Sequence, residues 1–213
     1  MDLEEMSTNS KLEINRARFQ KLNQLLEQFL PLTRWGFQES YSHILAEYRL
    51  YVIYDSEWCR VRFSLGGGDQ YFGDELSISY GKLHAPNDKN YMIFKGEDCW
   101  CWHSVLNALD FLDGTTPQQA VDRLQANGQW PWVAEHFRQS ELAQNLKYNH
   151  PEWLIRMHSA IWSHYGKRLF ELFDLRRPDL WEQYTRFIRE YYRIKGIPAP
   201  IPGYSAPPYD KIC

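Results

Sequence analysis

The chain has 213 residues, of which 44% are hydrophobic, 16% aromatic and 24% charged, and its net charge is −3. This length and aromatic content exclude a disordered chain, and no apolar run approaches the ~20 residues of a membrane span. The acidic balance argues against a basic nucleic-acid-binding module.

The start of the chain is polar and acidic, which is not the pattern of a signal peptide. Four cysteines in a chain of this length do not form the disulfide framework of a small secreted protein. We therefore expect a cytoplasmic protein.

Residues 1–10 carry no helix or strand pattern, and we expect them to be disordered. From Lys11 to Leu30 the apolar side chains fall mostly on one helical stripe, and Pro31 ends the helix.

The next segments predict an antiparallel meander of three or four strands. Residues 47–54 and 59–65 are expected to pair as a hairpin around a polar turn. Apolar and polar side chains alternate in 59–65 and again in Leu76–Tyr80, which predicts a further strand. A fourth short apolar run spans Tyr91–Phe94. In the second strand of the hairpin Arg60 and Arg62 alternate with apolar residues, so we expect them on a face open to water.

After Gly96 the sequence predicts helices. Asp98 can cap a helix that ends at Leu112, and Thr116 to Gln119 forms a capping box that opens the next helix. Proline begins two further helical segments, at 151–173 and 178–195. The last 17 residues, 197–213, carry five of the 11 prolines and predict an extended tail.

The fold class is therefore α+β: an N-terminal helix, a meander of three or four antiparallel strands, and a mostly helical C-terminal half. Residues 1–132 carry 12 Lys and Arg against 18 Asp and Glu, a net charge of −6, whereas residues 133–196 carry 11 against 8, a net charge of +3. We expect an α+β domain over 11–130, a helical extension packed on it over 131–196, and a proline-rich tail over 197–213.

The stretch GEDCWCWHS, residues 96–104, gathers the candidate catalytic residues Cys99, Cys101 and His103. On a strand these three side chains share one face and could bind a metal together with Cys59 or His84. However, a Cys-x-Cys pair is a poor fit to a structural zinc site, and on a helix the three side chains point in different directions. A cysteine in a first helical turn can be a nucleophile, although Glu97 and Asp98 raise the pKa of a nearby thiol. The interpretation we favour is core packing, with no metal and no cofactor.

Candidate binding residues lie in two places. Tyr71, Phe72 and Asp74 follow three glycines in a loop and could form an exposed binding tip. Arg60 and Arg62, on the face expected to be wet, could stack on bases, but the motifs of sheet-based RNA binders are absent.

Residues 35–112 combine a Gly-Phe entry, the hairpin YVIYDSEWCRVRFSL, the strand ELSISYGKL and a closing helix. This layout resembles small bacterial α+β proteins, which include the immunity proteins of toxin systems. The resemblance covers about a third of the chain. It implies binding through a variable surface, so no site residues are transferred.

We expect a non-enzymatic protein that binds another protein, of an immunity-like or regulatory kind, and an acidic surface suits a basic partner. The alternative is an enzyme that uses Cys99 or Cys101 with a histidine in a cleft between the sheet and the helical extension. The sequence predicts no membrane contact and argues against a nucleic-acid partner.

Overall fold

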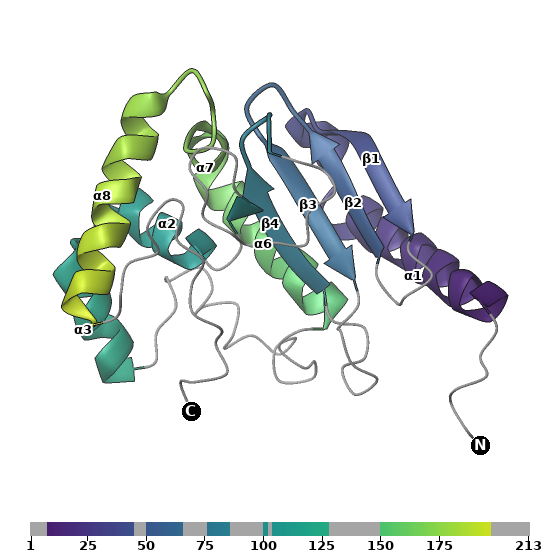
Figure 1. The fold of residues 1–213 in the computed structure, drawn as a ribbon, viewed down its shortest axis with the longest axis horizontal. Coiled ribbons are helices and arrows are strands. Elements are labelled where there is room, and N and C mark those ends of the chain that lie inside the picture. Colours follow the sequence, from purple (N-terminus) through teal and green to yellow (C-terminus); the bar gives the residue numbers. More distant parts are fainter. Residues whose placement is uncertain are drawn as a thin grey trace.

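A computed structural model describes residues 8–44, 50–65, 76–85, 100–101, 104–127 and 150–196. Figure 1 shows an N-terminal helix, an antiparallel sheet and a mostly helical C-terminal half. The predicted α+β class is therefore confirmed.

The helices are α1 (Thr8–Phe29), η2 (Leu32–Trp35, a 3-10 helix), α2 (Ser104–Leu112), α3 (Pro117–Asn127), α6 (Pro151–Tyr165), α7 (Lys167–Glu171) and α8 (Pro178–Ile194). The strands are β1 (Gln38–Ile44), β2 (Leu50–Asp55), β3 (Arg60–Leu65), β4 (Leu76–Gly81) and β5 (Trp100–Cys101). The first helix starts at Thr8, inside the stretch expected to be disordered.

The five strands lie in the order β1-β2-β3-β4-β5, and every neighbouring pair is antiparallel. The predicted hairpin is β2 and β3, in which Val52 lies opposite Phe63. Neither β1 nor β5 was predicted, because β1 is mostly polar and β5 has only two residues. The predicted strand at Tyr91–Phe94 lies outside the described residues.

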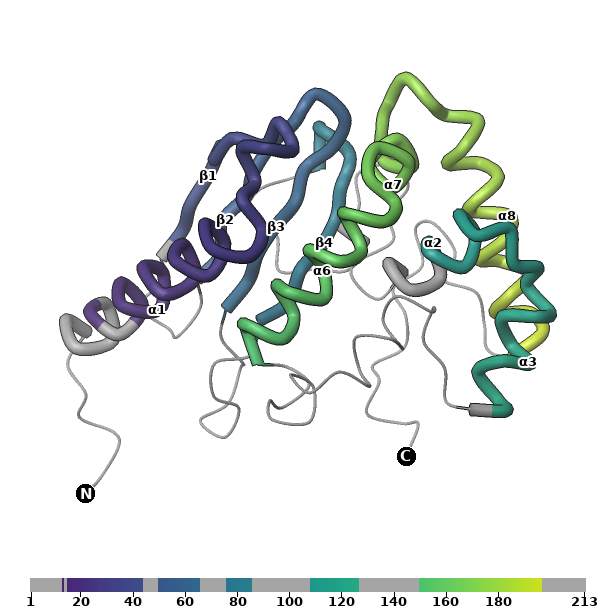
Figure 2. Tube along the Cα trace, turned by 180° about the vertical axis from the view of Figure 1, so that it is seen from behind, coloured from purple at the N-terminus to yellow at the C-terminus, as the bar shows by residue number. Residues whose placement is uncertain are grey.

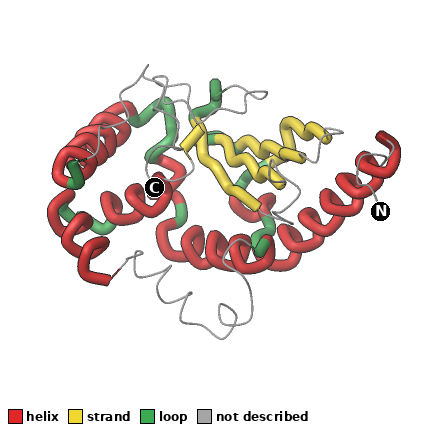
Figure 3. The backbone as a smooth tube through the Cα atoms, turned by 60° about the horizontal axis from the view of Figure 1, so that its bottom comes forward, coloured by secondary structure: helices red, strands yellow, loops and turns green. Residues whose placement is uncertain are grey.

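One face of the sheet, here called the helix face, packs on helices. Figures 2 and 3 show α1 and α6 running along this face. It carries a row of fully or almost fully buried side chains: Val52, Val61, Phe63, Ile78 and Tyr80. These belong to the same hydrophobic cluster as side chains of α6 and α8, so sheet and C-terminal helices share one core.

The opposite face of the sheet is also buried at its centre. Ile53 on this face packs against Ala85 and Tyr41. Arg60 and Arg62 are only 7% and 9% exposed. The prediction that these two arginines lie on a wet face is therefore wrong.

The helix expected from Asp98 begins later, because Trp100 and Cys101 pair with β4 as a strand and α2 starts at Ser104. Within α2 Leu109 is fully buried.

The capping box of α3 forms as predicted. The Thr116 backbone N–H donates to Gln119 Oε1 over 2.9 Å, and the Gln119 N–H donates to Thr116 Oγ1 over 3.3 Å. Two backbone N–H groups at the start of α3 thus donate to side-chain oxygens, although both residues are exposed. These hydrogen bonds determine where the helix begins.

Replacing the cap tests this contribution. We expect Thr116→Ala to lower the free energy of unfolding by about 1 kcal/mol, measured by urea denaturation. Thr116→Ser keeps a hydroxyl acceptor and serves as the control. Equal stability of the two variants would show that the cap does not contribute.

The predicted helix 151–173 is divided at Gly166, whose φ of 53° closes α6 and opens α7. Within the ranges given above, no helix is both long and apolar enough to cross a membrane.

Candidate functional site

The cysteine-rich stretch lies only partly within the described residues. Cys99 and His103 fall outside them, as do the loop residues Tyr71, Phe72 and Asp74. Cys101 lies on β5, where its backbone is opposite Tyr80 of β4. Whether these residues form a site therefore stays a prediction.

Arg60 is held inside the structure by a network on the opposite face. Its Nε donates to Asp55 Oδ1 over 2.8 Å and its Nη2 to Asp55 Oδ2 over 3.3 Å. Asp55 lies directly opposite Arg60 in the β2–β3 register. The Nη1 group donates to the Ala85 carbonyl, so this arginine ties the turn after β4 to the sheet.

Arg62 lies one row further along the same face, between Ile53 of β2 and Ser79 of β4. Burial lowers the pKa of its guanidinium, and the nearby Tyr51 acts in the opposite direction. A side chain this buried is not placed to stack on a nucleic-acid base, so the structure gives no support to a base-binding role for it.

A buried polar group that sequence reasoning missed lies between the sheet and α6. Trp162 Nε1 donates to Tyr80 Oη over 2.6 Å, and Tyr80 Oη lies 2.8 Å from His158 Nδ1. All three side chains are buried. An indole N–H can only donate, so Trp162 is the donor to Tyr80, and the tautomer of His158 decides whether its Nδ1 accepts the Tyr80 hydroxyl proton or donates to the Tyr80 oxygen.

Burial shifts both titratable members of this group towards their neutral forms. It lowers the pKa of His158 to about 3 and raises the pKa of Tyr80 well above its usual range. Neither is therefore poised to exchange a proton near neutral pH. The arrangement joins β4 to α6 and serves the core.

Cys59 is another fully buried side chain, and its thiol is free. Burial raises the pKa of this thiol far above its usual range, and a hydrogen bond from Ser56 only partly opposes the shift. A nucleophilic cysteine needs a thiolate and access, so Cys59 is a core residue.

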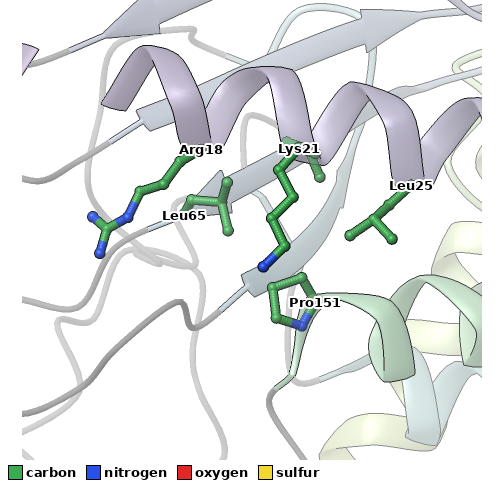
Figure 4. Close-up of a pocket in the computed structure, with 6 residues that line it drawn as sticks. Arg18, Lys21, Leu25, Leu65 and Pro151 are labelled. Carbon is green, nitrogen blue, oxygen red and sulfur yellow. The ribbon is translucent and has the colours of Figure 1, made fainter. Parts of the chain in front are cut away.

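A shallow hollow lies between α1, the end of β3 and the start of α6 (Figure 4). Lys21 extends over it towards Pro151, whereas the Arg18 side chain points away from Pro151. The hollow holds only about 10 Å³ of space for a water-sized molecule, far below the roughly 300–1,000 Å³ typical of ligand sites. We therefore assign no ligand to it.

The more distinctive surface is at the end of the molecule where η2, the β2–β3 turn and α7 meet. Here Trp35 and Trp58 are both half-buried and both pack on Phe170, with ring centroids 6.0 and 5.9 Å from it. A Cβ on Gly36 would lie 4.0 Å from the Trp58 ring, and one on Gly166 would lie 4.0 Å from Trp35. Two glycines with positive φ thus let both indole rings cover tight turns.

Leu175 lies in the connection between α7 and α8, next to Arg176 in the sequence. It is 42% exposed, the largest exposure of any big apolar side chain that the structure describes. The connection is tied to the β2–β3 turn, because Arg176 Nη2 donates to the Glu57 carbonyl over 3.4 Å. We call the surface formed by Arg34, Trp35, Glu57, Trp58, Lys167, Leu175 and Arg176 the tryptophan end.

Charges of both signs surround the apolar centre of the tryptophan end. Arg176 binds the buried Asp174 and lies 3.8 Å from a Glu57 carboxylate oxygen. Hydrogen bonds from Arg176 hold the pKa of Asp174 below its usual range. Lys167 lies over the Trp58 ring, 5.7 Å from its centroid, and 3.5 Å from Glu171. An apolar centre with a polar, charged rim is the usual anatomy of a protein–protein interface.

No group of three or more His, Cys, Asp or Glu side chains converges as a metal site within the described ranges. Comparison of the chain with protein-family models, with curated proteins and with solved structures gives no match.

Proposed function

We propose that this protein acts by binding another protein through the tryptophan end, as a non-enzymatic interaction or regulatory protein of the immunity-like kind. The observation that carries the proposal is that Phe170 holds two half-buried tryptophans at one end of the molecule, and that Arg176 ties the connection carrying the exposed Leu175 to the turn of Trp58. Tryptophan and arginine are the side chains that most often dominate binding energy when a partner covers them.

The surface also indicates the chemistry of the partner. An apolar or aromatic side chain of the partner would cover Trp58 and Leu175 and remove their remaining exposed area from water. Arg34, Lys167, Arg176 and Glu57 would face charges of the opposite sign on the partner, which favours orientation and fast association more than affinity. Three of these four side chains are cations, so this surface favours an acidic patch on the partner.

The test compares two variants that change equally exposed positions. Leu175→Asp with Arg34→Glu alters the tryptophan end, and Gln183→Asp with Arg186→Glu alters the outer face of α8. We expect a protein captured by the tagged wild type to be retained by the α8 variant and lost by the tryptophan-end variant, as measured by quantitative mass spectrometry. Capture of the same proteins by both variants would refute the proposal.

A third variant separates binding from the enzyme alternative. Cys99→Ser with Cys101→Ser removes both candidate nucleophiles and leaves the tryptophan end unchanged. We expect it to capture the same partner as the wild type. Loss of the partner in this variant alone, with an unchanged melting temperature, would instead favour a site built on the cysteines.

A further inference from the structure

The outer edge of β1 is a second surface suited to binding. Figure 1 shows β1 as the outermost strand, and among the described residues no strand pairs with its outer side. An open strand edge presents N–H and C=O groups that can pair with another strand. Proteins usually block such an edge with lysine or proline, and Gln38–Ile44 contains neither.

The strand has one irregular half and one regular half. The register with β2 shifts between Glu39 and Tyr41, so a bulge interrupts the first half. From Tyr41 to Ile44 the pairing is regular. This second half is therefore the part of the edge that can accept another strand.

The regular half carries aromatic rings on the opposite face of the sheet. Tyr41 and His43 lie opposite Ile53 and Tyr51 of β2. The rings of Tyr41, His43 and Tyr51 are nearly parallel, with centroids 5.5, 5.9 and 6.1 Å apart. Tyr41 Oη also lies 3.2 Å from His43 Nδ1. Ser42, between the two rings, points to the other side of the strand and is exposed.

This spacing is self-complementary under a twofold axis. If two copies of β1 run antiparallel with Ser42 opposite its own copy, Tyr41 lies opposite the partner's His43 and His43 lies opposite the partner's Tyr41. Residues directly opposite each other in an antiparallel pair share one face of the sheet, so the aromatic cluster would continue across the axis. A one-residue shift would place Tyr41 opposite Ser42 and lose these ring contacts.

We propose that two copies of this chain associate through β1, antiparallel and centred on Ser42, to form one continuous sheet. The twofold axis closes the pair, so the product is a dimer and not a fibre. A strand edge buries less area than a standard interface, and a dissociation constant in the micromolar range is expected. The dimer does not depend on the tryptophan end, which belongs to other elements.

The test substitutes Ser42, which in the proposed dimer lies opposite Ser42 of the second copy. We expect the full-length protein to show a concentration-dependent dimer in sedimentation equilibrium, at concentrations up to roughly 300 µM. Ser42→Lys or Ser42→Asp alone should weaken the dimer about fivefold or more, because two like charges then lie directly opposite each other. An equal mixture of the Lys and Asp variants should restore association, since opposite charges then meet.

Cross-linking provides an independent readout. Opposite residues of an antiparallel pair have Cα atoms about 4.5–5.5 Å apart, within the range that a disulfide spans. Oxidised Ser42→Cys should form a covalent dimer, and Gln20→Cys on the exposed side of α1 should not. A monomer at all concentrations, or a dimer that Ser42→Lys leaves unchanged, would overturn the proposal.

Discussion

Trp162→Ala is expected to lower the free energy of unfolding by about 3–5 kcal/mol, as truncation of large buried aromatic residues does. Trp162 is fully buried in α6 and packs against three other rings, with centroid distances of 4.9 Å to Phe170, 5.2 Å to Phe37 and 5.8 Å to Trp35. These neighbours come from α7, η2 and the start of the sheet. A cavity at Trp162 would therefore loosen contacts between elements far apart in the chain.

The measurement is urea denaturation of the wild type and two variants. Trp162→Phe keeps an aromatic ring in place but removes the N–H that binds Tyr80 and part of the buried ring volume, so we expect a smaller loss of about 1–2 kcal/mol. It also provides a folded reference if the alanine variant does not fold. A loss below about 1 kcal/mol for Trp162→Ala would contradict the packing described here.

Local patterns predicted the elements that depend on local chemistry. The box at Thr116 and Gln119 and the prolines at 151 and 178 mark helix starts because they act within one turn. The β-branched and aromatic residues of β2, the alternation in β3 and the polar turn between them predicted the hairpin that these strands form. Each of these signals depends on residues that are neighbours in sequence.

The errors concern interactions with residues distant in sequence or with backbone groups. The alternating pattern predicted that Arg60 lies on a face open to water. The side chain is buried instead, and this is possible because the Ala85 carbonyl and Asp55 accept hydrogen bonds from its guanidinium. β1 was missed because an edge strand needs no apolar run to pair with β2. His158 has a tyrosine partner 78 residues away, which no local pattern could reveal.

The tryptophan end could not be predicted from the sequence. Its contacts join three separate segments, because Phe170 packs on Trp35 and Trp58 and Arg176 binds the Glu57 carbonyl. The two turns that bring the tryptophans onto Phe170 depend on positive φ at Gly36 and Gly166. A glycine in a sequence does not by itself reveal which side chain will cover it.

The second large effect expected is loss of stability in mild acid, caused by His158. Its pKa is about 3 in the folded protein, against about 6.5 in an unfolded chain. Between these values the unfolded state binds one proton more than the folded state. The contribution of His158 to stability is therefore complete above pH 6.5 and is lost as the pH falls towards 3.

The expected slope is about 1.4 kcal/mol per pH unit below pH 6.5, or about 2 kcal/mol between pH 6.5 and pH 5. Urea denaturation of the wild type and of His158→Gln over this range measures it. The glutamine amide can accept the Tyr80 hydroxyl proton but does not titrate, so its stability should depend less on pH by about this slope. If wild type and His158→Gln lose stability in parallel, His158 is protonated without unfolding, and the neutral hydrogen-bonded group with Tyr80 and Trp162 does not hold in solution.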